Sequence, residues 1–171
     1  MQIPKNPANV ISFNKAKAQK VFEEAYGMQI NGFVDAAIDL YTRSIDLYPT
    51  AKAYTFLAWA HASRREYELA IEFCKIAIEI DPDYGNPYND AGAYLIELNR
   101  PLEARPYLEK AIKAKNYDYR FYPYYNLGKL HLMSKNYESA HRCFEKAVHL
   151  KPEFQAAQAE LEKLESSPTS S

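Results

Sequence analysis

Glycine is scarce in this chain of 171 residues, which contains only 5. A phosphate-binding P-loop needs two glycines with four residues between them, followed directly by Lys and then Ser or Thr. Gly27 and Gly32 have this spacing, but Phe33 stands where the lysine would be. The sequence also lacks a Gly-x-Ser-x-Gly elbow and a His-Glu-x-x-His pair. We therefore predict that the protein is not an enzyme and has neither catalytic residues nor a cofactor.

Cysteine is scarcer still, with Cys74 and Cys143 alone. We expect two free thiols, and since no Cys or carboxylate cluster accompanies the four histidines at zinc spacing, we expect no metal site. No apolar run approaches the ~18 residues that a membrane span needs. The first residues lack the basic and apolar regions of a signal peptide. These absences predict a cytoplasmic protein without membrane insertion.

An excess of positive charge is also missing. The chain has 21 Lys and Arg against 22 Asp and Glu, for a net charge of -1. A nucleic-acid partner is therefore not expected, because a phosphate backbone is attracted by a basic surface. Tyrosine, by contrast, is abundant, with 15 residues. This composition favours packed helices with aromatic surfaces.

Small residues recur along the chain with a period of about 34 residues. Each unit carries one small residue, a second one twelve residues later and a third seven residues after that, and three of the four units then end in proline. The three small positions are Ala25, Ala58, Gly92 and Gly128; Ala37, Ala70, Ala104 and Ala140; and Ser44, Ala77, Ala111 and Ala147. Apolar residues around them follow the helical spacing i, i+3, i+4, i+7, so each unit is predicted to form two amphipathic helices that cross at the small residues.

The pattern resembles the tetratricopeptide repeat. The fourth unit carries it best, with Tyr124, Leu127 and Gly128 on the first helix and Ala140, Phe144, Ala147 and Pro152 on and after the second. This resemblance implies an all-α, right-handed solenoid of antiparallel helix pairs with a C-terminal capping helix. We expect residues 1–13 to be irregular and residues 14–165 to form a single domain. Its repeats should span about 18–50, 51–84, 85–120 and 121–152, with the cap helix at 153–165 and a disordered tail at 166–171.

In such arrays one side of the first helices lines a concave groove where ligands bind. The resemblance implies a protein or peptide partner, of unknown identity, held in this groove. Offsetting the core positions by about 100° per residue gives the groove side chains of this chain. The candidates are Phe22, Tyr26, Lys52, Phe56, Trp59, Asn89, Asp90, Tyr122, Tyr125, Asn126 and Lys129. Phe22, Phe56 and Trp59 are expected to be exposed, and contiguous exposed apolar residues mark interaction sites, although packing between neighbouring helices is the alternative.

A subfamily of these repeats grips a C-terminal carboxylate with Lys and Asn residues and, on the third repeat, Lys and Arg. At the matching positions of the third repeat this chain has Asn86 and Asp90, so the clamp is absent. The leading hypothesis is an adaptor or chaperone-like module. The alternatives are a self-assembling scaffold that forms homo-oligomers, and an accessory protein of an assembly or secretion system. The Tyr-rich segment 117–125 is either packing or a second binding surface.

Overall fold

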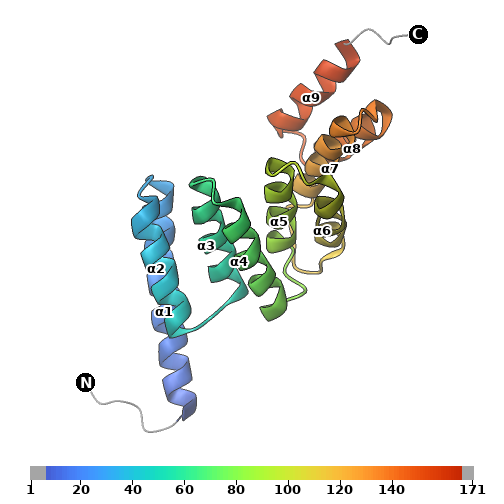
Figure 1. The fold of residues 1–171 in the computed structure, drawn as a ribbon. Helices are drawn as coiled ribbons and strands as arrows, with labels where there is room; N and C mark the ends of the chain where they lie inside the picture. The colour runs from blue at the N-terminus through green and yellow to red at the C-terminus, as the bar shows by residue number, and fades with distance from the viewer. Residues whose placement is uncertain (1–6, 167–171) are drawn as a thin grey trace. The chain divides into compact units, whose positions relative to one another are not determined.

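The computed structural model describes residues 7–166, with side chains from residue 9, and these residues form nine helices without a strand (Figure 1). Tyr84 and Asn116 form an isolated β-bridge. The predicted all-α solenoid of helix pairs with a C-terminal helix is confirmed. The helices fall into two compact units, Met1–Pro82 and Asp83–Ser171.

Unit 1 contains two helix pairs. The first pair is α1 (Pro7–Ile30) and α2 (Val34–Leu47), and the second is α3 (Ala51–Ser63) and α4 (Tyr67–Ile80). Consecutive helices pack against each other, and α1 also contacts α3. Because the first helices of the two pairs meet, their side chains form a common surface, which we call the first-helix face of unit 1.

Unit 2 contains two more pairs and the final helix. The pairs are α5 (Asn86–Glu97) with α6 (Pro101–Lys113) and α7 (Phe121–Met133) with α8 (Tyr137–Leu150), and α9 (Gln155–Ser166) packs on α8. Helix α7 contacts both α5 and α6. The residues of α5 and α7 that face away from α6 and α8 form the first-helix face of unit 2.

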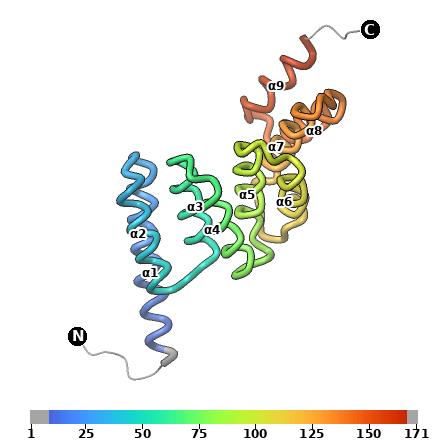
Figure 2. Tube along the Cα trace, viewed as in Figure 1, coloured from blue at the N-terminus to red at the C-terminus, as the bar shows by residue number. Residues whose placement is uncertain are grey.

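The expectation that residues 1–13 are irregular is wrong for residues 7–13, which belong to α1. The first turns of α1 extend beyond the end of α2 (Figure 2), and Ile11 and Phe13 are exposed there. A helix without a packing partner has no buried stripe, so this stretch shows no apolar period by which it could be recognised. Residues 1–6 and 167–171 lie outside the described residues, and Ser166, assigned to the tail, is the last residue of α9.

The small residues lie where the paired helices cross. The alanines at the first and second small positions have no solvent-accessible surface; they are Ala25, Ala58, Ala37, Ala70, Ala104 and Ala140. A Cβ atom on Gly92 would stand 2.5 Å from Cδ2 of Leu108, and one on Gly128 would stand 2.4 Å from Cε1 of Phe144. These contacts leave no room for a larger side chain at either glycine, because protein interiors are close-packed.

The turn inside each pair has the same backbone geometry. The second residue after the first helix has a positive φ: 84° at Gly32, 64° at Arg65, 57° at Asn99 and 55° at Lys135. In the last pair the amide of Lys135 donates to the carbonyl of Leu132 at 2.9 Å, and the amide of Asn136 donates to that of His131 at 2.8 Å. These two bonds are the Schellman motif, which satisfies the free carbonyls at a helix end.

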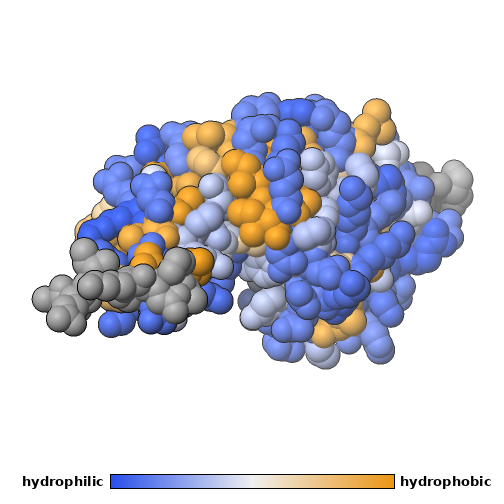
Figure 3. Space-filling model, turned by 90° about the horizontal axis from the view of Figure 1, so that it is seen from below, coloured by the Kyte–Doolittle hydropathy of each residue, from blue (hydrophilic) through white to orange (hydrophobic). Residues whose placement is uncertain are grey.

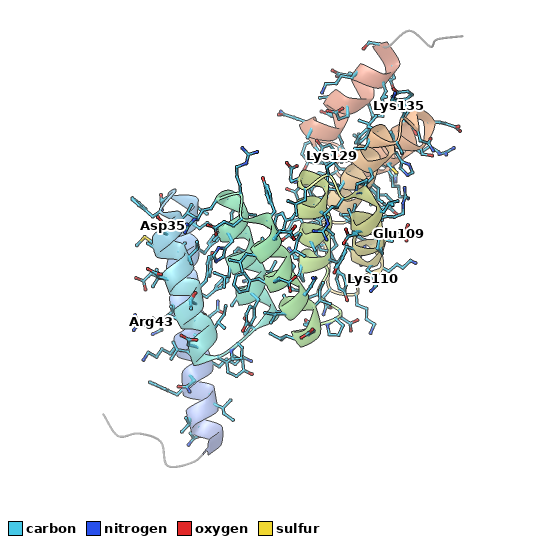
Figure 4. All side chains as sticks on the ribbon, viewed as in Figure 1. Asp35, Arg43, Glu109, Lys110, Lys129 and Lys135 are labelled. Atoms are coloured by element: carbon cyan, nitrogen blue, oxygen red, sulfur yellow. The ribbon has the colours of Figure 1, made fainter. Side chains whose placement is uncertain are left out.

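We expect Lys135→Gly to raise the free energy of unfolding by about 1 kcal/mol. Lys135 is exposed in the turn after α7 (Figure 4), and a left-handed backbone costs a non-glycine residue about 1–2 kcal/mol. Chemical denaturation followed by circular dichroism measures the change. The same substitution inside a helix, Lys146→Gly in α8, is the matched control and should lower stability by about 1 kcal/mol. A loss of stability in both variants would contradict the explanation.

Candidate functional site

Four aromatic residues form the first-helix face of unit 1, and we call them the aromatic shelf: Phe22, Tyr26, Phe56 and Trp59. The ring of Phe56 stands at its centre, with centroids 5.1 Å from Phe22, 5.6 Å from Tyr26 and 5.9 Å from Trp59, all edge-to-face. Tyr26 is 42% exposed and Trp59 is 41% exposed. The shelf therefore joins the core to solvent and presents two half-exposed rings held rigidly by their neighbours.

The structure corrects the expected exposure of two of these residues. Phe22 is only 6% exposed and packs against Tyr41 at a centroid distance of 5.5 Å, so it belongs to the core of unit 1. Phe56 is partly buried. The physical reason is that α1 and α3 are in contact, so the side chains at their boundary bury each other. Of the predicted aromatics, Tyr26 and Trp59 are the ones that present large exposed surfaces here.

A buried amide lies beneath the shelf. The hydroxyl of Tyr41 donates a hydrogen bond of 2.8 Å to Oε1 of Gln29, and burial raises the pKa of that hydroxyl, with a smaller contribution from Tyr26. The Nε2 atom of Gln29 is buried and has no hydrogen-bond partner among the described residues. An unsatisfied buried donor costs about 1–3 kcal/mol, so such donors are rare in folded proteins.

A cavity of about 160 Å³ opens beside Phe22. Its lining includes Ser44 and Tyr48 of the first pair and Lys52 of α3. The Nζ atom of Lys52 lies 4.8 Å from the centroid of the Phe22 ring, a cation–π distance. A water occupies about 30 Å³, so the cavity has space for a side chain of a ligand.

The first-helix face of unit 2 is polar at its centre. Nδ2 of Asn126 on α7 donates to Oδ1 of Asn89 on α5 at 3.0 Å, and Nδ2 of Asn89 donates to Oδ1 of Asp90 at 3.2 Å. We call these three residues the polar row. Asn89 and Asn126 are buried, so the amides predicted to pair with a ligand's backbone already bind each other.

Asp90 ends the polar row with a partly buried carboxylate. Burial raises its pKa to about 7, and the hydrogen bond from Asn89 offsets only part of this effect. Tyr117, from the loop before α7, is buried and lies close to the start of α5, since a Cβ on Gly85 would be 2.4 Å from Cβ of Tyr117. Burial and the nearby Asp90 raise the pKa of Tyr117.

The aromatic residues at the start of α7 pack mainly on the chain itself. Phe154, before α9, lies 5.0 Å from Phe121, 5.4 Å from Tyr122 and 5.2 Å from Tyr125 between ring centroids. Burial is also the main reason that the pKa of Tyr125 is raised. Tyr122 keeps 41% of its surface exposed, and Tyr119 in the preceding loop keeps 52%. The Tyr-rich segment is thus part packing and part exposed surface, and a partner contact there stays a prediction.

Lys129 is the last of the predicted groove residues. On α7 (Figure 4), its Nζ lies 3.4 Å from Oε1 of Glu97 at the end of α5. The pair is partly exposed, so it contributes little to stability and neutralises the charge of Lys129. On the side of the molecule in Figure 3, hydrophilic residues predominate and hydrophobic ones gather in patches.

Cys74 and Cys143 are free thiols, as predicted. No group of three or more His, Cys, Asp or Glu among the described residues could hold a metal ion, and no described helix is long and apolar enough to cross a membrane. Nδ1 of His61 donates a 2.6 Å hydrogen bond to Oε2 of Glu66, and the imidazole ring packs on the ring of Phe73. These contacts give His61 a structural role.

Sequence reasoning missed two residues that shape these faces, Tyr41 and Phe154. Nothing in the sequence indicates that the hydroxyl of Tyr41 reaches Gln29. Phe154 lies between α8 and α9, outside the repeat helices, where a periodic pattern gives no position. Tyr117 belongs to the Tyr-rich segment 117–125 and is buried, so this residue of the segment serves packing. The two predicted groups of groove residues lie in different units: the shelf with Lys52 in unit 1, and the polar row with Tyr122, Tyr125 and Lys129 in unit 2.

Comparison with known proteins gives matches along most of the chain. Residues 31–85, 86–118 and 121–154 match family profiles described as tetratricopeptide repeat. Over 151 residues, 88% of this chain, the sequence is 28% identical to small glutamine-rich tetratricopeptide repeat-containing protein 2 of Saccharomyces cerevisiae. The chain spans 40% of the length of that relative.

Two solved structures are similar in fold. The pilF protein of Pseudomonas aeruginosa superimposes with a TM-score of 0.81 at 25% identity, covering 88% of this chain and 68% of pilF. The first such repeat domain of Spaghetti (RPAP3), solved with the HSP90 peptide SRMEEVD, has a TM-score of 0.62 at 18% identity, covering 68% of this chain and 90% of that domain.

Proposed function

Because the chain belongs to the tetratricopeptide repeat family, we propose that it acts without catalysis as a cytoplasmic adaptor that holds an extended peptide of a partner protein. Repeats of this family serve protein–protein interaction, and pilF and the RPAP3 domain show this fold in proteins of different kinds. The peptide would bind to a first-helix face.

The aromatic shelf is the observation that carries this proposal. Two half-exposed rings, Tyr26 and Trp59, pack on Phe56, which also packs on Phe22. A cavity sized for a side chain opens beside Phe22. An extended peptide has a carbonyl oxygen for each residue and apolar side chains to cover the rings. Fixed aromatic surfaces with few rotatable bonds bind at a low cost in conformational entropy.

The shelf can be tested with peptides selected by the protein itself. A phage library of random dodecapeptides is panned on the parent chain, and calorimetry measures the affinity of the selected peptides. We expect a Tyr26→Ala, Trp59→Ala double variant to bind about ten- to hundredfold more weakly, because covering two half-exposed rings contributes roughly 2–3 kcal/mol. Both side chains are substantially exposed, so the variant should keep the helical circular dichroism of the parent.

The matched control is Tyr137→Ala, which removes a 58% exposed ring from α8, a second helix. It should leave the affinity unchanged. Unchanged affinity in a folded shelf variant, or an equal loss in the control, would mean that the peptides bind elsewhere.

The self-assembling scaffold remains the second candidate, because Ile11 and Phe13 are exposed on the part of α1 that extends past α2. Light scattering separates the two functions. A scaffold increases in mass with concentration and loses this behaviour in an Ile11→Lys, Phe13→Lys variant. An adaptor keeps the mass of a monomer over the same concentrations.

A further inference from the structure

Asp90 occupies a central position on the first-helix face of unit 2. It stands two residues before Gly92, as Asn126 stands two residues before Gly128, and both glycines lie at helix crossings. Its repeat position is therefore the one that Phe56 fills on the aromatic shelf of unit 1. A side chain at this position of the fold faces the surface that we propose for the peptide.

The carboxylate of Asp90 has no cationic partner. Within the part of the chain that the structure describes, its one hydrogen bond comes from the neutral amide of Asn89, and no ion pair is formed. The polar row holds Asn89 in place, because Asn126 donates to the same side chain from α7. Asp90 is partly buried, and a carboxylate with little water around it and no cationic partner is unfavourable. Above the pH at which it ionises, the free protein therefore keeps a pre-oriented anionic acceptor at its surface.

Two cations of unit 2, Arg120 and Lys129, have other partners. The guanidinium of Arg120 donates to the backbone carbonyls of Ile112, at 3.1 Å, Ala114, at 2.7 Å, and Tyr117. Lys129 pairs with Glu97. Neither cation is available to Asp90 without breaking these contacts.

An aromatic ring lies next to the polar row. Tyr122 stands four residues before Asn126 on α7, so the two side chains lie one helical turn apart on the same face of that helix. Asn126 in turn bonds Asn89, the neighbour of Asp90 on α5. Tyr122 keeps 41% of its surface in solvent. An ammonium or guanidinium group is attracted by the faces of such rings as well as by a carboxylate.

We propose that Asp90 and Tyr122 form a binding site for a basic side chain, lysine or arginine, of the peptide that the first-helix face holds. The inference rests on the proposed function and assigns the charge of its ligand. The cation pairs with the carboxylate, and its apolar stem lies on the ring of Tyr122. Asp90 stands where the carboxylate-gripping subfamily has a cation, so this face selects the opposite charge.

A small-molecule titration tests the site without a partner protein. Nα-acetyl-lysine N-methylamide is added to the ¹⁵N-labelled protein, and chemical shifts of the amides around Asp90 and Tyr122 are followed. We expect saturable shifts for the parent and at least a tenfold weaker affinity for Asp90→Asn. The norleucine analogue keeps the alkyl stem without the ammonium and should give no saturable shift.

Two further variants separate specific binding from general attraction. Asp118→Asn removes an exposed carboxylate from the preceding loop and should bind the lysine probe as the parent does. Tyr122→Phe should also bind it, whereas Tyr122→Ala should weaken it several-fold. Equal affinity in Asp90→Asn and parent, or equal losses in Asp118→Asn and Asp90→Asn, would overturn the proposal. Such a result does not contradict peptide binding at the aromatic shelf, because that proposal is tested separately with selected peptides.

Discussion

Gly128→Leu should lower the free energy of unfolding by about 3 kcal/mol or more, at the upper end of what overpacking a core costs. A Cβ at this position would be 2.4 Å from Cε1 and 2.7 Å from Cδ1 of Phe144. Phe144 has no exposed surface and cannot rotate away. The added atoms therefore push α7 and α8 apart at their crossing. Urea denaturation followed by circular dichroism measures the loss.

Gly27→Leu is the matched control for this substitution. Gly27 also lies in a first helix, but no atom comes within 4 Å of a Cβ built there. Leucine has a higher helix propensity than glycine by somewhat under 1 kcal/mol, so this variant should be as stable as the parent or slightly more so. If the two variants lose the same stability, the crossing is not what requires glycine at position 128.

The second large effect concerns the pH dependence of stability. The pKa of Asp90 is raised to about 7 in the folded protein, against about 3.9 in an unfolded chain. Between these values the folded state holds a proton that the unfolded state has released. The contribution of Asp90 is fully present below pH ~4 and is lost as the pH rises through ~7, with a slope approaching about 1 kcal/mol per pH unit.

Asp90→Asn should remove this dependence and make the protein more stable than the parent at pH 8. Measuring unfolding free energies at several pH values from 5 to 8 for both proteins checks the prediction. The titratable group beside Asp90 is the phenol of Tyr117, whose pKa is raised by burial, so it stays protonated in this range. Asp118→Asn serves as the control and should keep the parent's slope. Parallel curves for parent and Asp90→Asn would contradict the prediction.

Most of the fold could be predicted from the sequence because each position of the repeat has a fixed role in helix packing. Ala58 or Gly92 can be recognised as a crossing point wherever small residues recur in phase, since only small side chains let two helices approach. The residue types at the Schellman turns show no comparable pattern. Gly32 reveals its positive φ by residue type, but Arg65 and Lys135 do not, because they adopt this conformation against their own preference.

The candidate site was less accessible to prediction. A helical wheel gives the direction of Phe22 relative to its own helix, but not how closely α3 approaches α1, and this distance decides that Phe22 is buried. The wheel also placed Asn89 and Asn126 correctly on one face. It could not show that their amides would bond to each other, because that depends on the spacing of α5 and α7.

The position of Trp59 has an optical consequence. It is the only tryptophan of the chain, and it lies half-exposed on the aromatic shelf. When the protein is excited at a wavelength that only indole absorbs, all of the emission therefore comes from this surface. A peptide that covers the ring removes water from around the indole and shifts its emission to shorter wavelength. The protein carries a built-in reporter at the surface where we propose that its partner binds.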